Sequence, residues 1–142
     1  MQSETDPLEG LGERVLAVAA ALDDAHIPHA FGGAIAYNYV GEPRATRDID
    51  INIFLPETES APTLGALRDI GVTFDLQWAK DTILRTGQVR IRWDHVPVDL
   101  FFNTVPLHDA MISRVRLVPF RGRIIPTLSA EDLTLSKIAF NR

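Results

Sequence analysis

The 142-residue chain contains no cysteine, and none of its apolar runs approaches the roughly 20 residues that a membrane-spanning helix needs. The absence of cysteine excludes disulfide bonds, thiolate metal sites and cysteine nucleophiles, and it favours a cytoplasmic location. The apolar stretch Val15–Leu22 follows acidic residues, whereas a secretory signal peptide starts with basic ones. We therefore expect a cytoplasmic protein that does not bind a membrane.

Internal repeats, low-complexity tracts and linkers are also missing from the sequence. Its length, with 46% hydrophobic and 23% charged residues, fits one globular domain over residues 1–142. The net charge of −5 argues against a protein that coats nucleic acids in general. Basic residues outnumber acidic ones only from Met111 onward. This fits either an ordinary solvated surface or a site that holds cations in one place and phosphates in another.

Hydrophobic spacing and turn residues predict alternating helices and strands. Apolar residues recur at helical spacing from Leu8 to Ala25, and Pro28 ends that pattern. Ser129 can cap a final helix, with Asp132 completing a capping box. The order of elements predicts an α+β (mixed α/β) domain around a small sheet. The expected helices are 8–25, 34–40, 60–70, 77–85, 107–113 and 129–142, and the expected strands are 29–31, 48–55, 88–94, 96–102, 115–120 and 123–125, with hairpin turns at 94–95 and 121–122.

Two aspartates, Asp48 and Asp50, interrupt the apolar pattern of the strand expected at 48–55. Side chains alternate along a strand, so both carboxylates point to the same face. Crowded carboxylates repel each other and are costly to bury without a partner, and a divalent cation removes that cost. Carboxylate oxygens are the ligands that Mg²⁺ prefers. A solvated strand end without any ligand is the alternative.

Asp99 places a third carboxylate inside the second apolar strand, 96–102. If this strand lies beside 48–55, the three aspartates can hold two cations about 4 Å apart, the spacing of two-metal phosphoryl chemistry. Because two apolar strands are interrupted in the same way, a metal site is favoured over unrelated surface charges.

A glycine pair, Gly32 and Gly33, lies between an expected strand and an expected helix. Glycine lets the backbone approach a ligand closely, and the N–H groups at a helix N-terminus bind phosphate oxygens. A tight turn without a ligand is the alternative. Thr46 and Arg47 immediately precede Asp48 and can contact phosphate, while a structural ion pair explains Arg47 equally well.

Histidines and arginines elsewhere suggest two weaker candidates. A zinc site is disfavoured, because Pro28 breaks the helix that would bring His26 and His29 onto one face. Arginines around the hairpin expected at 115–125 could guide RNA phosphates, although a charged edge that prevents strand pairing is the more frequent meaning. These arginines are Arg114, Arg116, Arg121 and Arg123.

The combined motifs resemble the nucleotidyltransferase superfamily, which includes DNA polymerase beta and aminoglycoside nucleotidyltransferases. Its pattern is a glycine pair, a helix and a strand with Asp-x-Asp, followed by a later strand with a third carboxylate. The chain looks most similar to the minimal bacterial AbiEii-type toxin nucleotidyltransferases, through the segments Pro43–Asp50 and Glu131–Lys137. The likeness covers nearly the whole chain. In two respects the chain differs: many relatives have Gly-Ser in place of Gly32-Gly33, and relatives of the toxin type continue into a further helical region.

The resemblance implies a role for each candidate residue. Asp48 and Asp50 would hold the Mg²⁺ (or Mn²⁺) that is bound to a nucleoside triphosphate. All three aspartates would hold a second cation, and Asp99 would be the general base toward an acceptor hydroxyl. The Gly32-Gly33 pair would cradle the phosphates. Lys137 either reaches the triphosphate or is an ordinary exposed helix lysine.

Two functions are compatible with the resemblance. The first is transfer of a nucleotide monophosphate to a hydroxyl of RNA, of a protein or of a small molecule, with pyrophosphate leaving. Such an enzyme could be the toxin of a toxin–antitoxin pair, with a cognate antitoxin as partner. The second is a non-catalytic binding module of the same fold, an antitoxin or a regulatory subunit. The presence of Asp48, Asp50 and Asp99 favours the enzyme, because degenerate members usually lose one carboxylate.

Overall fold

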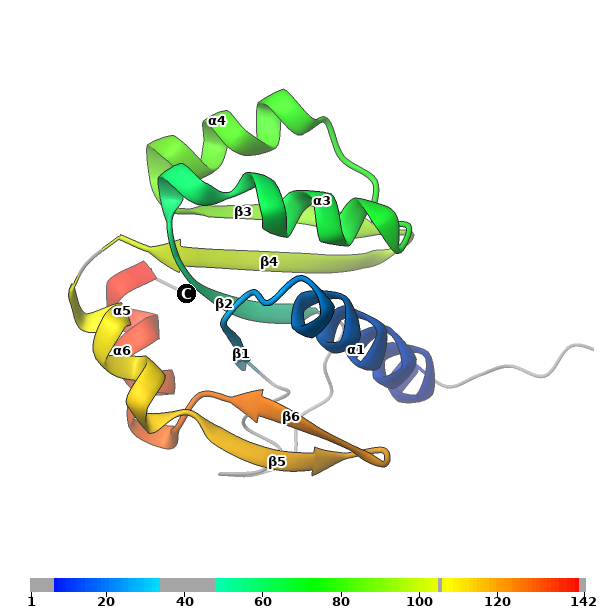
Figure 1. Ribbon diagram of the computed structural model, residues 1–142, viewed down its shortest axis with the longest axis vertical. Helices are drawn as coiled ribbons and strands as arrows, with labels where there is room; N and C mark the ends of the chain where they lie inside the picture. The colour runs from blue at the N-terminus through cyan, green and yellow to red at the C-terminus, as the bar shows by residue number, and fades with distance from the viewer. Residues whose placement is uncertain (1–6, 34–47, 105, 141–142) are drawn as a thin grey trace, which may run out of the picture.

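The computed structural model describes residues 7–33, 48–104 and 106–140, and it confirms the α+β class (Figure 1). The helix expected at 34–40 lies outside the described residues. The strands are β1 (His29–Phe31), β2 (Ile49–Pro56), β3 (Gln88–Trp93), β4 (Val96–Asn103), β5 (Arg116–Phe120) and β6 (Arg123–Thr127). The helices are α1 (Pro7–Asp24), α3 (Ala61–Asp69), α4 (Leu76–Thr86), α5 (Pro106–Met111) and α6 (Ala130–Phe140), with 3-10 turns at Glu57–Glu59 and Ile112–Arg114.

These strands form one mixed sheet in the order β3-β4-β2-β1-β6-β5. β2 runs parallel to β4 and antiparallel to β1, and β1 runs parallel to β6. The predicted hairpins are confirmed, since β3 pairs with β4 and β5 pairs with β6 in antiparallel fashion. In the second hairpin, Arg121 and Gly122 take φ values of 51° and 85°. Two successive positive φ angles are what a two-residue type I′ turn requires.

The main core lies on one face of the sheet, under α1, α3 and α4. Ile49, Ile51 and Ile53 alternate along β2 and are fully buried, as the period-two pattern predicts. α1 presents Val15 and Leu22 to this core, both without exposed surface. Figure 1 shows α1 and α3 lying across this face. The other faces of β2 and β4 are therefore free to carry polar side chains.

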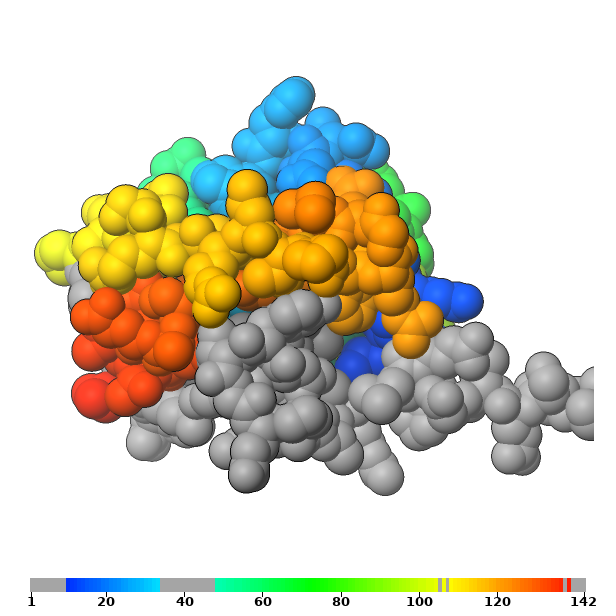
Figure 2. Space-filling view, turned by 90° about the horizontal axis from the view of Figure 1, so that it is seen from below, coloured from blue at the N-terminus to red at the C-terminus, as the bar shows by residue number. Residues whose placement is uncertain are grey.

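A smaller apolar cluster joins the opposite face to α5 and α6. It contains Ala30 and Phe54 from the sheet, Met111 at the end of α5, and Leu128 and Leu133 around the start of α6. In Figure 2 the β5–β6 hairpin (orange), α5 (yellow) and α6 (red) form one continuous side of the molecule. This cluster places α6 on the sheet face that carries the aspartates.

The start of α6 is fixed by a side-chain cap and an ion pair. The Asp132 backbone N–H donates to Ser129 Oγ over 3.1 Å, so the predicted Ser129 cap is confirmed. The Asp132 carboxylate accepts from Ser129 Oγ, also over 3.1 Å, whereas in a capping box it accepts from the backbone N–H of the capping residue. The Asp132 carboxylate is fully buried, and Arg114 Nη2 donates to Asp132 Oδ1 over 2.6 Å. Arg114 thus lies in the 3-10 turn before β5 and anchors α6. Arg123 likewise pairs with Asp23 over 2.7 Å, so these two arginines have structural roles.

None of the helices in the described part of the chain is both long enough and apolar enough to cross a lipid bilayer.

Candidate active site

The pairing of the central strands brings the predicted carboxylates together. In the parallel pair of β2 and β4, Asp50 lies directly opposite Asp99. Asp48 precedes Asp50 by two residues and shares its face of the sheet. The expectation that the two interrupted strands are neighbours is therefore confirmed. Adjacent strands lie about 4.8 Å apart, so the Asp50 and Asp99 side chains start within reach of one ligand.

The aspartates are tolerated in apolar strands because they point away from the main core. Their chain neighbours Ile49, Val98 and Leu100 are fully buried on the opposite face. The Asp48 side chain keeps 42% of its surface exposed and that of Asp99 keeps 13%. The Asp99 carboxylate is therefore more desolvated than that of Asp48 and has the greater need of a charged partner.

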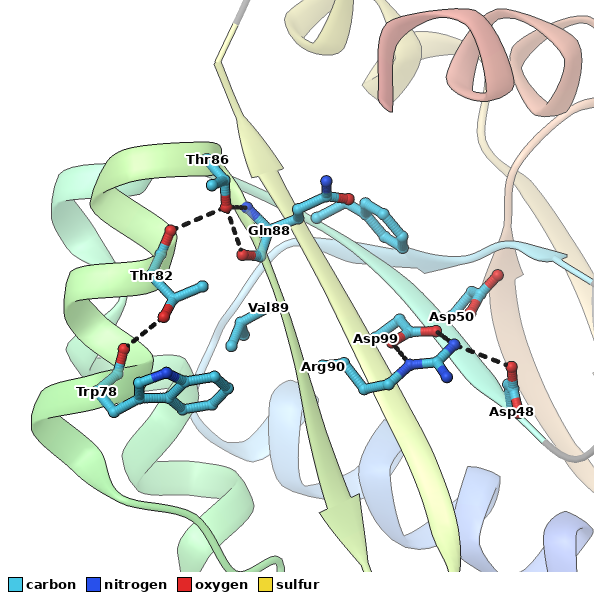
Figure 3. Close-up of a pocket in the computed structure, with 10 residues that line it drawn as sticks. Asp48, Asp50, Trp78, Thr82, Thr86, Gln88, Val89, Arg90 and Asp99 are labelled. Atoms are coloured by element: carbon cyan, nitrogen blue, oxygen red, sulfur yellow. Dashed lines mark hydrogen bonds and ion pairs between the residues drawn. The ribbon is translucent and has the colours of Figure 1, made fainter. Parts of the chain in front are cut away.

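Arg90 on β3 supplies that partner (Figure 3). Its Nε donates to Asp99 Oδ1 over 2.7 Å, and its Nη2 donates to Asp99 Oδ2 over 2.9 Å. Nη2 also donates to Asp48 Oδ2 over 3.2 Å. The hydrogen bonds with Asp99 raise the pKa of the Arg90 guanidinium, and the charges of Asp48 and Asp50 add to this effect. One guanidinium thus offsets part of the negative charge of the cluster.

Sequence patterns did not single out Arg90, although one signal for it exists. A two-residue turn at Asp94-His95 makes Trp93 pair with Val96 and, counting back along both strands, places Arg90 opposite Asp99. The alternation of β3 gave only an exposed position for Arg90. The predicted hairpin register would have identified the ion pair.

The glycine pair lies beside Asp50 on the other side of the cluster. Gly32 N–H donates to the Asp50 carbonyl oxygen over 2.8 Å, which extends the row from Arg90 on β3 through Asp99 on β4 and Asp50 on β2 to Gly32, the residue that follows β1. Gly33 has φ +55°, and a Cβ at this position would collide with Asp50 Oδ2. Gly33 is therefore required both by its left-handed backbone and by its closeness to the carboxylate.

The remaining predicted site residues are less fully described. Thr46 and Arg47 lie outside the described residues. Lys137 belongs to α6, on the sheet face of the aspartates, but its side chain is not among those that the structure describes.

An open cavity of about 610 Å³ contains the three aspartates and extends past β3 to α4 (Figure 3). Its volume lies within the usual range for small-molecule sites. No sequence pattern had pointed to α4 as part of this cavity. The residues that line the cavity are Asp48, Asp50, Asp99, Arg90, Gln88, Val89, Phe101, Trp78, Thr82 and Thr86.

The donor chemistry of this cavity suits a hard divalent cation, because Asp50 and Asp99 offer carboxylate oxygens side by side. Among the described residues, no group of three His, Cys, Asp or Glu side chains has the arrangement of a metal centre. Arg90 lies between Asp99 and Asp48, so a cation would have to replace its guanidinium there. None of the described histidines belongs to such a group either.

Comparison with protein-family models gives no match, and no curated protein sequence is similar at a significant level. Solved structures are similar in fold. The antibiotic-resistance factor ANT(2'')-Ia superimposes with a TM-score of 0.62 at 15% identity, over 89% of this chain and 69% of its own. TM1012 of Thermotoga maritima, a proposed nucleotidyltransferase, gives 0.61 at 17% identity, over 92% and 84%. The lincosamide antibiotic adenylyltransferase LnuA, with lincomycin bound, gives 0.57 at 16% identity, over 87% and 83%. The chain therefore has the nucleotidyltransferase fold.

Proposed function

We propose that this protein is a metal-dependent nucleotidyltransferase. The observation that carries the proposal is the row formed by Gly32, Asp50 and Asp99 across the centre of a nucleotidyltransferase fold, with Asp48 beside it. Of the similar structures, LnuA is an antibiotic adenylyltransferase and TM1012 is a proposed nucleotidyltransferase, which supports transfer of a nucleotide as the general reaction. Carboxylates in an open cavity beside a close-approach glycine suit a phosphate ligand that binds together with a divalent cation.

The reaction joins an acceptor hydroxyl to the α-phosphorus of a nucleoside triphosphate. The acceptor oxygen forms a bond to phosphorus as the bond to the pyrophosphate oxygen breaks, and pyrophosphate leaves. Asp99 takes the hydroxyl proton, and the backbone at Gly32 and Gly33 orients the phosphates. Asp48, Asp50 and Asp99 would hold Mg²⁺ or Mn²⁺, which would supply positive charge against the negative charge that builds up on the phosphate oxygens. Catalysis then consists mainly of positioning and charge neutralisation.

Arg90 acts within this proposal as the partner of Asp99 before a cation arrives. Its two short hydrogen bonds keep the Asp99 carboxylate oriented in the absence of metal. The Arg90 side chain is 53% exposed, so the guanidinium can turn toward solvent, or toward a phosphate, at small cost. Arg90 is therefore a positioning residue in the resting state.

The fold does not identify the acceptor or the biological role, so both are further parts of the proposal. The acceptor is a hydroxyl of RNA, of a protein or of a small molecule. A role as a bacterial AbiEii-type toxin with a cognate antitoxin rests on the sequence motifs at Pro43–Asp50 and Glu131–Lys137.

A non-catalytic binding module is the second candidate function, and the Arg90 ion pair favours it. A guanidinium that satisfies Asp99 and Asp48 without a cation would be a permanent structural link in a module that binds no metal. The two candidates differ in one measurable property. The enzyme must exchange Arg90 for a divalent cation, whereas the module must not.

Transfer of label tests the enzyme directly. The protein is incubated with Mg²⁺, a cell extract and each of the four nucleoside triphosphates labelled at the α-phosphate. We expect one or more of them to place label on a discrete acceptor, with release of unlabelled pyrophosphate. A variant with both Asp50→Asn and Asp99→Asn is the matched control and should transfer nothing. Equal labelling by both proteins, or none by the wild type with any triphosphate, would reject the transferase.

A further inference from the structure

The cavity has a second wall that the transfer chemistry does not use. On α4, Trp78, Thr82 and Thr86 follow one another at intervals of four residues, so they share one face of the helix, and all three line the cavity. Thr82 Oγ1 donates to the Trp78 carbonyl over 2.7 Å, and Thr86 Oγ1 donates to the Thr82 carbonyl over 2.9 Å. Because both hydroxyls are bound to the helix backbone, this wall is mostly apolar.

Trp78 is the largest group on this wall and is half exposed, at 50%. Asp75 caps α4 by accepting a hydrogen bond from the Trp78 N–H over 2.8 Å, which fixes the backbone of this residue. In Figure 3 the indole points from α4 toward Val89 and Arg90 on β3. An aromatic ring that is exposed inside a cavity, on a backbone held in place by a helix cap, is a surface on which another ring can stack.

The order of elements places this wall opposite the glycine pair. Along the sheet, Gly32 lies beside Asp50, Asp50 beside Asp99, and Asp99 beside Arg90 on the edge strand β3, with α4 beyond it. In phosphoryl transfer the attacking and leaving oxygens lie roughly in line on opposite sides of phosphorus. If the leaving pyrophosphate lies at Gly32-Gly33, the acceptor must approach from the side of β3 and α4.

Resting on the proposed function, we propose that the groove between α4 and β3 is the acceptor subsite and that it stacks a nucleobase of the acceptor on Trp78. The acceptor is then the hydroxyl end of a nucleoside or an RNA strand, and not a saturated sugar antibiotic. This assigns Trp78 as a specificity-determining residue of the reaction.

The polar groups around the groove match a nucleotide. The side-chain amide of Gln88 lines the cavity and makes no hydrogen bond with any described residue, so its donors and acceptor can meet the edge of a base. Arg92 is exposed on the same face of β3 as Arg90, where it can contact a backbone phosphate. An aromatic plane and a cation are the usual elements of single-strand binding, and hydrogen bonds to base edges add sequence preference in RNA recognition.

Binding of ribodinucleotides tests the subsite without any transfer reaction. Adenylyl-adenosine and uridylyl-uridine are titrated into the wild-type protein. Backbone amide signals, which all variants retain, are followed by NMR to measure affinity, and the Trp78 indole N–H signal is followed where tryptophan is present. The same titrations are made with Trp78→Ala, with Trp78→Phe, and with Leu84→Ala as the matched control. Leu84 lies on the same helix with 53% exposure but does not line the cavity. A saturated aminocyclitol serves as the non-aromatic probe.

We expect saturable dinucleotide binding in the wild type and in Leu84→Ala. Binding should be roughly tenfold weaker in Trp78→Ala, because the stacking of one base is lost. Trp78→Phe should recover most of the affinity, and the aminocyclitol should not shift the Trp78 signal. Equal dinucleotide affinity in Trp78→Ala, or no saturable binding in the wild type at millimolar concentrations, would overturn the subsite.

Triphosphate binding separates the subsite from the proposed function. Trp78→Ala should bind a Mn²⁺–triphosphate as tightly as the wild type does. If it loses triphosphate and dinucleotide affinity together, the groove holds the base of the donor and the assignment is wrong. If the wild type binds dinucleotides on Trp78 but no Mn²⁺–triphosphate, the stacking subsite holds while the proposed transfer reaction fails.

Discussion

Arg90 and Asp99 face each other across the β3–β4 hairpin and are joined by two hydrogen bonds of 2.7 and 2.9 Å. The pair occupies the position where the proposed enzyme must place a cation. Asp99, with 13% of its side chain exposed, gains most from the partner, whereas Arg90, with 53%, can leave at small cost. The site therefore has a resting arrangement that a divalent cation has to displace.

Arg90→Gln should bind Mn²⁺ more tightly than the wild type, because no guanidinium has to be displaced. Half-exposed ion pairs contribute about 1 kcal/mol, which corresponds to a severalfold gain in Mn²⁺ affinity. The metal-free variant should lose a similar amount of stability. Calorimetry with Mn²⁺ and thermal unfolding with and without the ion measure the two effects. Arg92→Gln is the control, since Arg92 shares the strand face but forms no ion pair with the described residues. Weaker Mn²⁺ binding in Arg90→Gln alone would show that Arg90 does not compete with the cation, whereas no Mn²⁺ binding by the wild type would favour the non-catalytic module.

Gly33→Ala should destabilise the protein and abolish binding of a Mn²⁺–triphosphate. The left-handed conformation at φ +55° costs an alanine about 1–2 kcal/mol, and its Cβ would collide with Asp50 Oδ2. The carboxylate then has to move away from the position at which it would hold a cation. Chemical denaturation and calorimetry test the two effects. Gly65→Ala in α3 is the control, because a Cβ there meets nothing within 4 Å and alanine favours a helix. Full triphosphate binding by a folded Gly33→Ala would reduce the glycine pair to a simple turn.

His29 should make the stability depend on pH. Burial lowers the pKa of the His29 imidazole below its usual 6.5, and the carbonyl of Ile27, 2.9 Å from Nδ1, opposes this only in part. The unfolded chain then binds a proton more readily than the folded one, so the contribution of His29 is complete above pH 6.5 and declines as the pH falls below it.

The His29→Asn variant tests this dependence. Free energies of unfolding at pH 7.5 and 5.5 should differ less in His29→Asn than in the wild type. His26→Asn is the control, because His26 is exposed and asparagine tolerates its φ of 57°. An unchanged pH dependence in His29→Asn would show that the buried imidazole does not titrate on unfolding.

The central sheet was predictable because its signals are local. Alternation along 48–55 placed Ile49, Ile51 and Ile53 on one face and Asp48 and Asp50 on the other, and β2 has this arrangement. Capping at Ser129 was predictable for the same reason, since the interacting atoms are three residues apart. Local spacing decides such features before any long-range contact forms.

The partners of the carboxylates depend on contacts that are distant in sequence. Arg90 meets Asp48 across 42 residues, which no periodicity reports. The closeness of Gly33 to Asp50 arises from the pairing of β1 with β2, so the glycine pair could be taken for a turn on sequence grounds. The wall formed by Trp78 on α4 likewise depends on how that helix packs against β3. The carboxylates were therefore predictable from the sequence, whereas their resting partner Arg90 and the second wall of the cavity were not.

Asp50→Asn and Asp99→Asn should separate nucleotide binding from transfer. Asp50 lies between Gly33 and Asp99, so its loss removes a ligand of the nucleotide-bound cation, and Asp50→Asn should bind Mn²⁺–triphosphate poorly. Asp99→Asn removes the proton acceptor and frees Arg90 from its bidentate pair, so triphosphate binding should stay within a few-fold of the wild type.

Label transfer by Asp99→Asn should nevertheless be lost, because a general base alone contributes about a hundred- to ten-thousand-fold in rate. Calorimetry measures the binding and the α-phosphate label measures the transfer. Asp81→Asn, an exposed position on α4, controls for the change of one charge. Wild-type transfer by Asp99→Asn would make Asp99 a structural partner of Arg90. Loss of triphosphate binding in Asp99→Asn alone would instead exchange the roles given to Asp50 and Asp99, because the nucleotide-bound cation would then depend on β4.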